Sequence, residues 1–357
     1  NGSFHCDFDA DYINYLILFG NQAGFGAGLS PNITAQKVAV ARKRGLRVVV
    51  VDPIGGNAAA KADEWIPIRP GTDAALALSM LNVLLNEVGI YDRDFIKRHT
   101  NGPYLVKPDG YYMRQDGKPL VWDLAEGKAK PYDAEVGDYA IEGSFQVEGI
   151  ECRPAFELLK EHAKKYTPGM AAEITTVPAD TICRLAEEFG KEASIGSTIV
   201  IDGQELPYRP VAANIYRGAG AHKHGVGAAL AVQLLNMIVG NFYVPGGHRG
   251  TNLVGPSWQW APGEYDGLIT VPAQPKKGEI REAYAFVEDR DYYTYKSKPP
   301  EDLNLNELHP ISTNRSPMKV QTSIDPEKYK LPYKPEVLLV CRRNLFMGGC
   351  DFEMTAK

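Results

Sequence analysis

The chain contains 357 residues, of which 44% are hydrophobic and 23% are charged, and its formal net charge is −5 at pH 7. A chain of this length can bury a large core and is expected to form two domains or lobes. No run of Lys or Arg forms a phosphate-binding patch, so we expect no nucleic-acid partner. No stretch of 18 residues is uniformly apolar, and we therefore expect no direct membrane span.

The cysteines form no C-x-x-C pair and are scattered along the chain. An odd, unpaired set favours reduced thiols over a disulfide framework, and it matches no zinc or iron–sulfur spacing. We therefore assign no metal ligand within this chain. The five cysteines are Cys6, Cys152, Cys183, Cys341 and Cys350.

The two ends of the sequence resemble interior positions of a longer protein. The chain begins with Asn1 and no signal peptide, and it ends at Lys357 soon after an expected strand. We therefore expect a fragment. The sequence is compatible with a bacterial or archaeal cytoplasm or periplasm, because an export signal would lie upstream of Asn1.

The first 98 residues alternate between apolar strands and helices, which is typical of a parallel sheet. Residues 15–19 are expected to form a strand that leads into a glycine-rich loop at 20–28, and a helix is expected at 33–43. A second strand at 47–51 ends at Asp52, and a helix is expected at 74–88. This order predicts an α/β fold with a Rossmann-like parallel sheet flanked by helices.

The rest of the chain is less regular. Frequent Pro and Gly residues predict an irregular excursion at 100–150. Further elements are expected at 154–165, 178–191 and 228–239 (helices) and at 197–201 and 337–340 (strands). Because the loops at Gly20-Asn21 and Arg343-Asn344 resemble each other, we expect a first dinucleotide-binding lobe at 1–250 and part of a second, similar α/β lobe at 251–357.

The glycine-rich loop predicts a nucleotide site at the carboxyl edge of the sheet, where open α/β folds bind their ligands. Its glycines permit close approach of a pyrophosphate, whose negative charge the following helix N-terminus favours. Their spacing is not a regular G-x-G-x-x-G, which argues against NAD. The alternative is a tight turn that only packs strand against helix. The glycines are Gly20, Gly24, Gly26 and Gly28.

Two acidic residues extend this pattern. Asp52 follows the second strand, where a carboxylate can accept hydrogen bonds from ribose hydroxyls, although it can also cap the turn before Pro53. Asp73 follows Gly71-Thr72 at the start of a helix. Its carboxylate can accept hydrogen bonds from N1–H and N2–H₂ of guanine, which adenine does not offer, or it can simply cap the helix.

Residues 52–53 and 62–76 closely resemble the molybdopterin oxidoreductases of the dimethyl sulfoxide reductase superfamily. The resemblance covers essentially the whole chain. Its other landmarks are Phe19-Gly20-Asn21, the segments 91–96 and 99–102, the helix 234–241 and the loop Pro245-Gly246-Gly247.

The resemblance implies a bis(molybdopterin guanine dinucleotide) cofactor that carries molybdenum or tungsten. Two lobes would each hold one dinucleotide. The positions implied for the first dinucleotide are Gly20, Asn21, Asp52, Gly71, Thr72 and Asp73, and those for the second are Arg343 and Asn344.

The segment 217–225 is similar to one that passes beside the pterins and the metal. Many members of the family carry Gln-His where this chain has Ala221-His222. His222 is a candidate proton donor or acceptor near the metal, or it holds the loop by hydrogen bonds. Arg217 is a candidate for contact with an anionic substrate or a pterin phosphate, or it forms a structural salt bridge. His224 and His248 are weaker candidates.

Three hallmarks of the family are missing from the sequence. The 4Fe–4S cysteine motif and the C-terminal domain that closes over the pterins are absent, and Cys6 lies too close to the first strand to be the metal ligand. The resemblance implies that the cluster lies in an N-terminal domain outside this chain. The partner that it implies is an iron–sulfur electron-transfer subunit.

The predicted function is therefore that of the central part of a molybdenum or tungsten enzyme. Its implied chemistry is two-electron oxygen-atom or hydride transfer on a small-molecule substrate. A hydratase or transhydroxylase of the same family is one alternative, and a non-catalytic structural homologue from a respiratory complex is another. The retained acidic residues and glycines argue against the latter. An NAD-dependent dehydrogenase is disfavoured by the glycine spacing.

Overall fold

The computed structural model describes residues 6–25 and 31–251. One compact unit comprises Asp7–Arg249, and Asn1–Cys6 with Gly250–Lys357 form the other. The strand expected at 337–340, and Arg343 and Asn344, lie outside the described residues.

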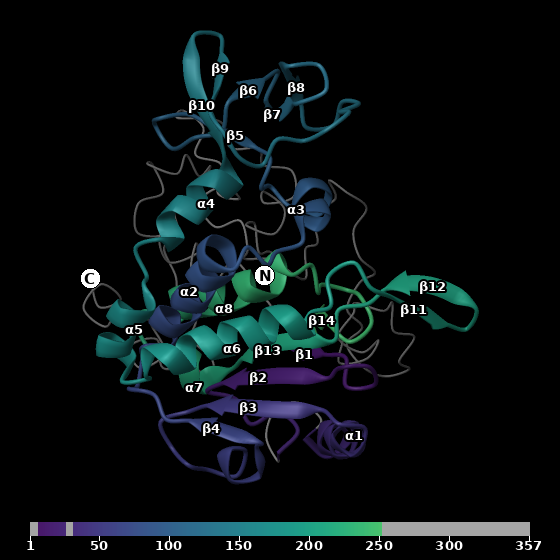
Figure 1. The fold of residues 1–357 in the computed structure, drawn as a ribbon, viewed down its shortest axis with the longest axis vertical. Coiled ribbons are helices and arrows are strands. Elements are labelled where there is room, and N and C mark those ends of the chain that lie inside the picture. The colour runs from purple at the N-terminus through teal and green to yellow at the C-terminus, as the bar shows by residue number, and fades with distance from the viewer. Residues whose placement is uncertain (1–5, 26–30, 252–357) are drawn as a thin grey trace, which may run out of the picture. The chain divides into compact units, whose positions relative to one another are not determined.

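A four-stranded parallel sheet forms the centre of the Asp7–Arg249 unit (Figure 1). Its strands are β2 (Tyr15–Phe19), β3 (Arg47–Val51), β4 (Glu64–Ile66) and β13 (Val211–Ile215), in the spatial order β13-β2-β3-β4. Ile215 pairs with Phe19, Phe19 with Val51, and Val51 with Ile66, so all four strands end at one level. The predicted Rossmann-like sheet is confirmed.

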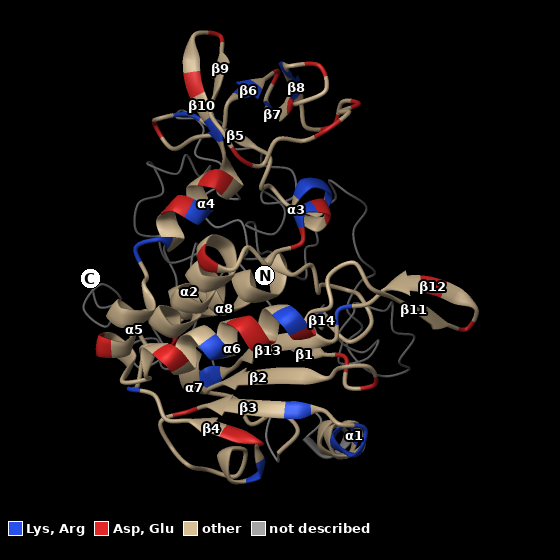
Figure 2. Cartoon of the chain, viewed as in Figure 1, with Lys and Arg blue, Asp and Glu red and all other residues tan. Residues whose placement is uncertain are grey.

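Side chains alternate between the two faces of this sheet, as strand geometry requires. Tyr15, Ile17 and Phe19 join a core with α2 (Asp73–Asn82), α6 (Ala179–Glu192) and α8 (Gly225–Ile238). Leu16 and Leu18 instead pack toward α1 (Pro31–Lys43) on the opposite face (Figure 1). The sheet is thus covered on both faces, and its strands carry few charged residues (Figure 2).

The remaining elements surround this core. The helix expected at 74–88 continues from α2 into a π-helical turn, η2 (Val83–Glu87). The other helices of the described unit are η1 (Ala59–Lys61), α3 (Arg93–His99), α4 (Ala155–Ala163), α5 (Pro168–Thr175) and α7 (Arg217–Gly220). A hairpin consists of β11 (Thr198–Ile201) and β12 (Gln204–Pro207), while β1 (Cys6–Phe8) and β14 (His248–Thr251) are short strands.

The segment expected to be irregular at 100–150 instead forms a small antiparallel module. Two three-stranded sheets, β5-β10-β9 and β6-β7-β8, enclose a separate apolar cluster that includes Leu105, Leu120 and Val147. The Pro and Gly residues that suggested irregular structure lie mainly in the turns between short strands. The strands are β5 (Leu105–Val106), β6 (Arg114–Gln115), β7 (Lys118–Asp123), β8 (Lys128–Pro131), β9 (Phe145–Val147) and β10 (Ile150–Pro154).

A cluster around Glu142 joins this module to the helices beneath it. The Glu142 carboxylate accepts hydrogen bonds from the Tyr91 hydroxyl (2.9 Å), from Arg93 (3.1 Å) and from the Lys160 ammonium group. Burial alone would raise the pKa of Glu142, but the hydrogen bonds from Lys160, Tyr91 and Arg93 outweigh it and lower the pKa to about 2. The ionised carboxylate is therefore stabilised in the folded chain.

We expect Glu142→Gln to reduce the unfolding free energy at pH 7 by about 1 kcal/mol, since the site is partly exposed to solvent. A lowered folded-state pKa gives stability that is present above the unfolded pKa and is lost as the pH falls toward the folded pKa. The difference between wild type and variant should therefore shrink from about pH 5 to about pH 2 in urea unfolding. Exposed Glu135→Gln is the control, and a difference independent of pH would contradict the assignment.

Candidate cofactor site

The candidate site lies where the connections of the sheet diverge. From β2 the chain proceeds to β3 and β4 on one side, and it returns later to form β13 on the other side of β2. In open α/β sheets such a switch point opens a crevice outside the carboxyl ends of the strands. Gly20 follows β2 here, and the turn that begins at Tyr216 follows β13.

Gly20 allows these two chain segments to approach each other. Its φ is +50°, and a Cβ atom here would lie 2.2 Å from the backbone nitrogen of Ala219. The Gly218 N–H donates to the Gly20 carbonyl oxygen at 3.0 Å, and the Gly20 N–H donates to Val51 at 2.9 Å. The requirement for glycine at position 20 thus comes from contact between the two turns.

Gly24 has a different role. Its φ is +83°, and a Cβ atom there would lie 2.5 Å from a methyl carbon of Val38 on α1. Close helix–strand packing is therefore a sufficient reason for this glycine, as in one alternative raised by the sequence. Gly26 and Gly28 lie outside the described residues.

Asn21 is buried beside Gly20, with 4% of its surface exposed. Its Nδ2 donates to Oδ1 of Asn214 at 3.0 Å, and its Oδ1 accepts from the Ala23 N–H at 2.8 Å. The sequence did not indicate Asn214, which lies 193 residues away on β13. Gln22, also missed, lies near the loop after β3, because a Cβ atom on Gly56 would be 3.4 Å from its Nε2.

Asp52 follows β3 at the same edge of the sheet. One carboxylate oxygen accepts from the Ile54 N–H at 2.9 Å, which is the turn-capping geometry that the sequence left open. The Asp52 carbonyl oxygen accepts from the Trp65 indole at 2.8 Å. The side chain is half-buried and lies at the edge where a ribose contact is expected.

Asp73 is the first residue of α2 and has only 4% of its surface exposed. Burial raises the pKa of its carboxyl group, its own backbone N–H and His222 oppose this shift, and Asp52 adds to it. The Thr72 hydroxyl donates to Arg69 at 2.7 Å and does not cap the helix. Asp52, Asp73 and His222 therefore lie close enough to influence one another.

Gly71 separates this acidic pair from the histidine loop. Its φ is +76°, and a Cβ atom at this position would lie 3.8 Å from Nδ1 of His222. A side chain would be strained by the backbone and would touch the imidazole ring. The loop that carries His222 thus lies against the Gly71-Thr72-Asp73 turn.

Both ring nitrogens of His222 bond within its own loop. Nδ1 accepts from the His224 N–H at 3.2 Å, which leaves Nε2 to donate to the Ala219 carbonyl oxygen at 3.0 Å. This favours the loop-holding alternative over proton transfer. Ala221 is exposed, and the Arg217 guanidinium lies 5.9 Å from the ring centre of Tyr216.

The two weaker histidine candidates differ in environment. His224 is exposed, with its ring centre 6.3 Å from that of His222. His248 is fully buried, and burial lowers its pKa to about 4, so its imidazole is neutral near pH 7. His224 thus accompanies the candidate site, whereas His248 is enclosed in the protein.

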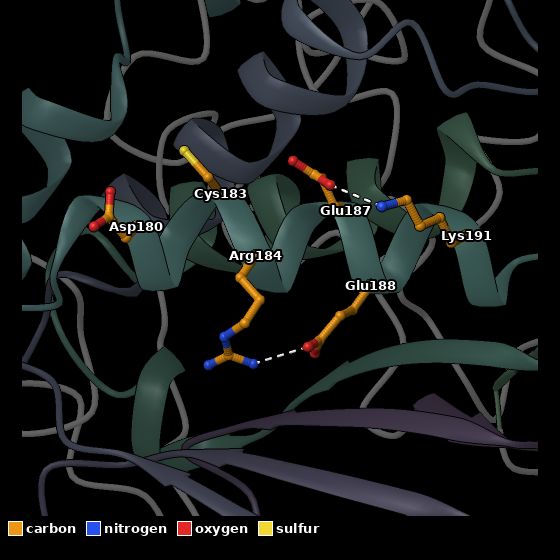
Figure 3. Close-up of a pocket in the computed structure, with 6 residues that line it drawn as sticks. All are labelled: Asp180, Cys183, Arg184, Glu187, Glu188 and Lys191. Carbon is orange, nitrogen blue, oxygen red and sulfur yellow. Dashed lines mark hydrogen bonds and ion pairs between the residues drawn. The ribbon is translucent and has the colours of Figure 1, made fainter.

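A hollow on α6 lies away from this site (Figure 3). Arg184 and Glu188 face the sheet, where Arg184 also pairs with Glu64 and Glu188 with Arg47. Glu64 and Arg47 are the first residues of their strands, so this ionic group joins α6 to the amino ends of the strands. It is at the opposite edge of the sheet from Gly20 and Asp52.

The described residues hold neither a membrane-spanning helix nor a cluster of metal ligands. No helix in the ranges 6–25 and 31–251 is long and apolar enough to cross a membrane. Within the same described ranges, no three His, Cys, Asp or Glu residues are grouped as a metal site.

Comparisons with known proteins identify the family of this chain. The family model for molybdopterin oxidoreductases matches residues 9–303. A sulfite dehydrogenase of Allochromatium vinosum, represented by one of its chains, is 35% identical over 58% of this chain and 24% of its own length. The alpha chain of perchlorate reductase from Dechloromonas aromatica is 33% identical over 50% of this chain and 24% of its own length.

Among solved structures, acetylene hydratase from Pelobacter acetylenicus has a TM-score of 0.44 and 23% identity, over 70% of this chain and 24% of the hydratase chain. The chain thus spans about a quarter of the length of these relatives. Since the family model matches most of the sequence, the chain belongs to the molybdopterin oxidoreductase family.

Proposed function

We propose that this chain holds the guanine end of a molybdopterin guanine dinucleotide in an enzyme with a bis(molybdopterin guanine dinucleotide) cofactor. The observation that carries the proposal is the Asp73 carboxylate, which is 4% exposed at the N-terminus of α2. A buried carboxylate at this position is favoured by the helix dipole. N1–H and N2–H₂ of guanine are two adjacent donors that match its two oxygen atoms.

The neighbouring residues fit the rest of the dinucleotide. Asp52 ends β3 at the edge where a ribose would lie. Gly71 leaves the approach to Asp73 without a side chain, and Thr72 lies between them. Gly20 and Arg217 border the crevice at the switch point, where the pyrophosphate and pterin would be held. Arg343 and Asn344 are proposed for the second dinucleotide.

His222 and Ala221 contribute through their loop. With both ring nitrogens bonded, His222 keeps the segment 219–224 folded against Gly71. We assign His222 the role of shaping the wall beside the cofactor, and we keep proton transfer as a secondary role that would require one of its hydrogen bonds to open. The bound cofactor would supply a molybdenum or tungsten centre that changes between the +4 and +6 states.

The proposed reaction is two-electron redox chemistry on a small molecule. Relatives named for sulfite, perchlorate and dimethylsulfide support this class of substrate. A non-catalytic role is disfavoured because Asp52, Gly71 and Asp73 are all retained. A hydratase or transhydroxylase of the same family would differ in consuming no electron donor or acceptor. Turnover that needs neither would therefore replace the redox reaction by this alternative.

The proposed partner is an iron–sulfur electron-transfer subunit. It is supported by relatives whose names describe them as subunits. The 4Fe–4S cluster of the enzyme itself is proposed to lie outside this chain. The compartment is proposed to be the cytoplasm or periplasm of a bacterium or archaeon.

Replacing Asp73 tests the guanine assignment. We expect Asp73→Asn in the purified enzyme to weaken retention of the guanine end by about 1.5–3 kcal/mol, because a charged hydrogen-bond acceptor is lost. The measurement is the amount of GMP released by acid hydrolysis per mole of protein, together with molybdenum or tungsten content. Asp94→Asn is the matched control, because Asp94 is an exposed acid in the first turn of α3. Normal GMP content in Asp73→Asn would refute the assignment.

A further inference from the structure

Buried asparagines form a connected polar chain across the crevice. Asn241 Nδ2 donates to Asn236 Oδ1 at 2.9 Å. Asn236 then accepts from the Ala213 N–H at 2.8 Å and donates to the Ala213 carbonyl oxygen at 2.7 Å. Asn214, the next residue on β13, accepts from Asn21 Nδ2 at 3.0 Å. The chain therefore runs from the end of α8 through β13 to the loop after β2.

Asn236 takes the place of a neighbouring strand. β13 is an edge strand that pairs only with β2 among the described residues, and Asn236 bonds both backbone groups of Ala213 on its other side. A one-residue shift of a strand would turn its side chains to the opposite face. The fully bonded amide therefore fixes the position of β13 along its axis, and with it the position of Asn214.

Asn214 and Asn21 transfer this position to the loop after β2. Only 1% of Asn214 and 4% of Asn21 is exposed. Asn21 Oδ1 accepts from the Ala23 N–H at 2.8 Å, so its amide is oriented at both ends by this chain. The two turns are also joined by the Gly218 N–H, which donates to Gly20 at 3.0 Å. A single bond of that kind would leave the loop free to rotate.

We propose that Asn21 and Asn214 are positioning residues, which hold the 20–25 loop against the turn after β13. Asn21 thus acts on the dinucleotide by setting the width of the crevice, and it does not bind the dinucleotide itself. The inference rests on the proposed function for the identity of the ligand. The placement of the loop, in contrast, can be measured without any ligand.

A double-mutant cycle in the purified enzyme distinguishes positioning from direct contact. The variants are Asn21→Ala, Asn214→Ala and the combination, with exposed Asn57→Ala as the control. Positioning predicts that both single variants lose a similar share of GMP and metal content, about tenfold, and that the double variant loses no more. Normal content in Asn214→Ala beside a loss in Asn21→Ala would establish direct contact and overturn the proposal, as would additive losses.

Hydrogen exchange of the Ala23 amide is the readout that needs no cofactor. Because this N–H bonds to Asn21, we expect its exchange in the cofactor-free chain to become about tenfold faster in Asn214→Ala. Unchanged exchange would overturn the positioning role. A wild-type enzyme without pterin or metal would refute the proposed function, whereas this measurement would still decide the inference.

A second pair of variants applies if the alanine variants do not fold. Asn214→Asp retains the acceptor for Asn21 Nδ2, whereas Asn21→Asp has no N–H to donate. We therefore expect higher cofactor content and slower Ala23 exchange in Asn214→Asp than in Asn21→Asp. Equal values for the two variants would contradict the proposal.

Discussion

Replacing Asp92 by Ala is expected to lower the unfolding free energy by about 3–5 kcal/mol, because it leaves the buried charge of Arg209 without its partner. Asp92 Oδ2 accepts from Arg209 Nη2 at 2.7 Å and from its Nε at 3.3 Å. Asp92 Oδ1 caps α3 by accepting from the Phe95 N–H at 2.9 Å. Loss of this cap adds to the cost. Urea unfolding followed by circular dichroism measures the effect.

The position of this ion pair explains the size of the expected effect. The Asp92 N–H donates to Ile238 at the end of α8, and Arg209 also donates to the carbonyl oxygens of Tyr208 and Ser197 beside the β11–β12 hairpin. The pair therefore joins three parts of the unit. Asp92→Ala combined with Arg209→Met should cost less than the sum of the single changes, since no unpaired charge remains. Additive costs would show that the two charges are independent.

Replacing Asn236 by Leu is the second change with a large expected effect, about 3 kcal/mol. Leu has a similar volume but removes the hydrogen bonds to both backbone groups of Ala213, which then stay buried without these partners. It also removes the acceptor for Asn241 Nδ2 at 2.9 Å. The decrease should appear in urea unfolding as a lower midpoint with an unchanged slope.

Asn57→Leu provides the comparison for this experiment. Asn57 is exposed in the loop after β3, and such surface substitutions change stability by about 0.5 kcal/mol or less. If Asn236→Leu and Asn57→Leu have equal effects, Asn236 does not support the edge of the sheet.

Elements with strong local patterns could be predicted from the sequence. The strands at 15–19 and 47–51 are uninterrupted apolar runs, and each forms with those bounds. The helix expected at 178–191 forms as Ala179–Glu192, because its apolar residues follow helical spacing. Asp52 and Asp73 lie at a strand end and a helix start, as expected, since those positions follow directly from the elements.

Elements that depend on distant partners could not be predicted. β13 has the sequence Val-Ala-Ala-Asn-Ile, whose small and polar residues give little strand propensity, and it becomes a strand through pairing with β2. β4 is only three residues long. In the site, the link between Asn21 and Asn214 joins residues 193 positions apart, which no local pattern reveals. The same holds for the two ring bonds of His222, which depend on how its loop folds.

The way β13 ends the sheet also affects how the protein can associate. An exposed strand edge offers unpaired N–H and C=O groups to which a strand of another molecule can add, and this is a common route to aggregation. At β13, Asn236 occupies both groups of Ala213, and Asn241 donates to Val211 at 2.7 Å. Strand addition from another molecule is therefore blocked at this edge by side chains, without a bulge, proline or charge on the strand.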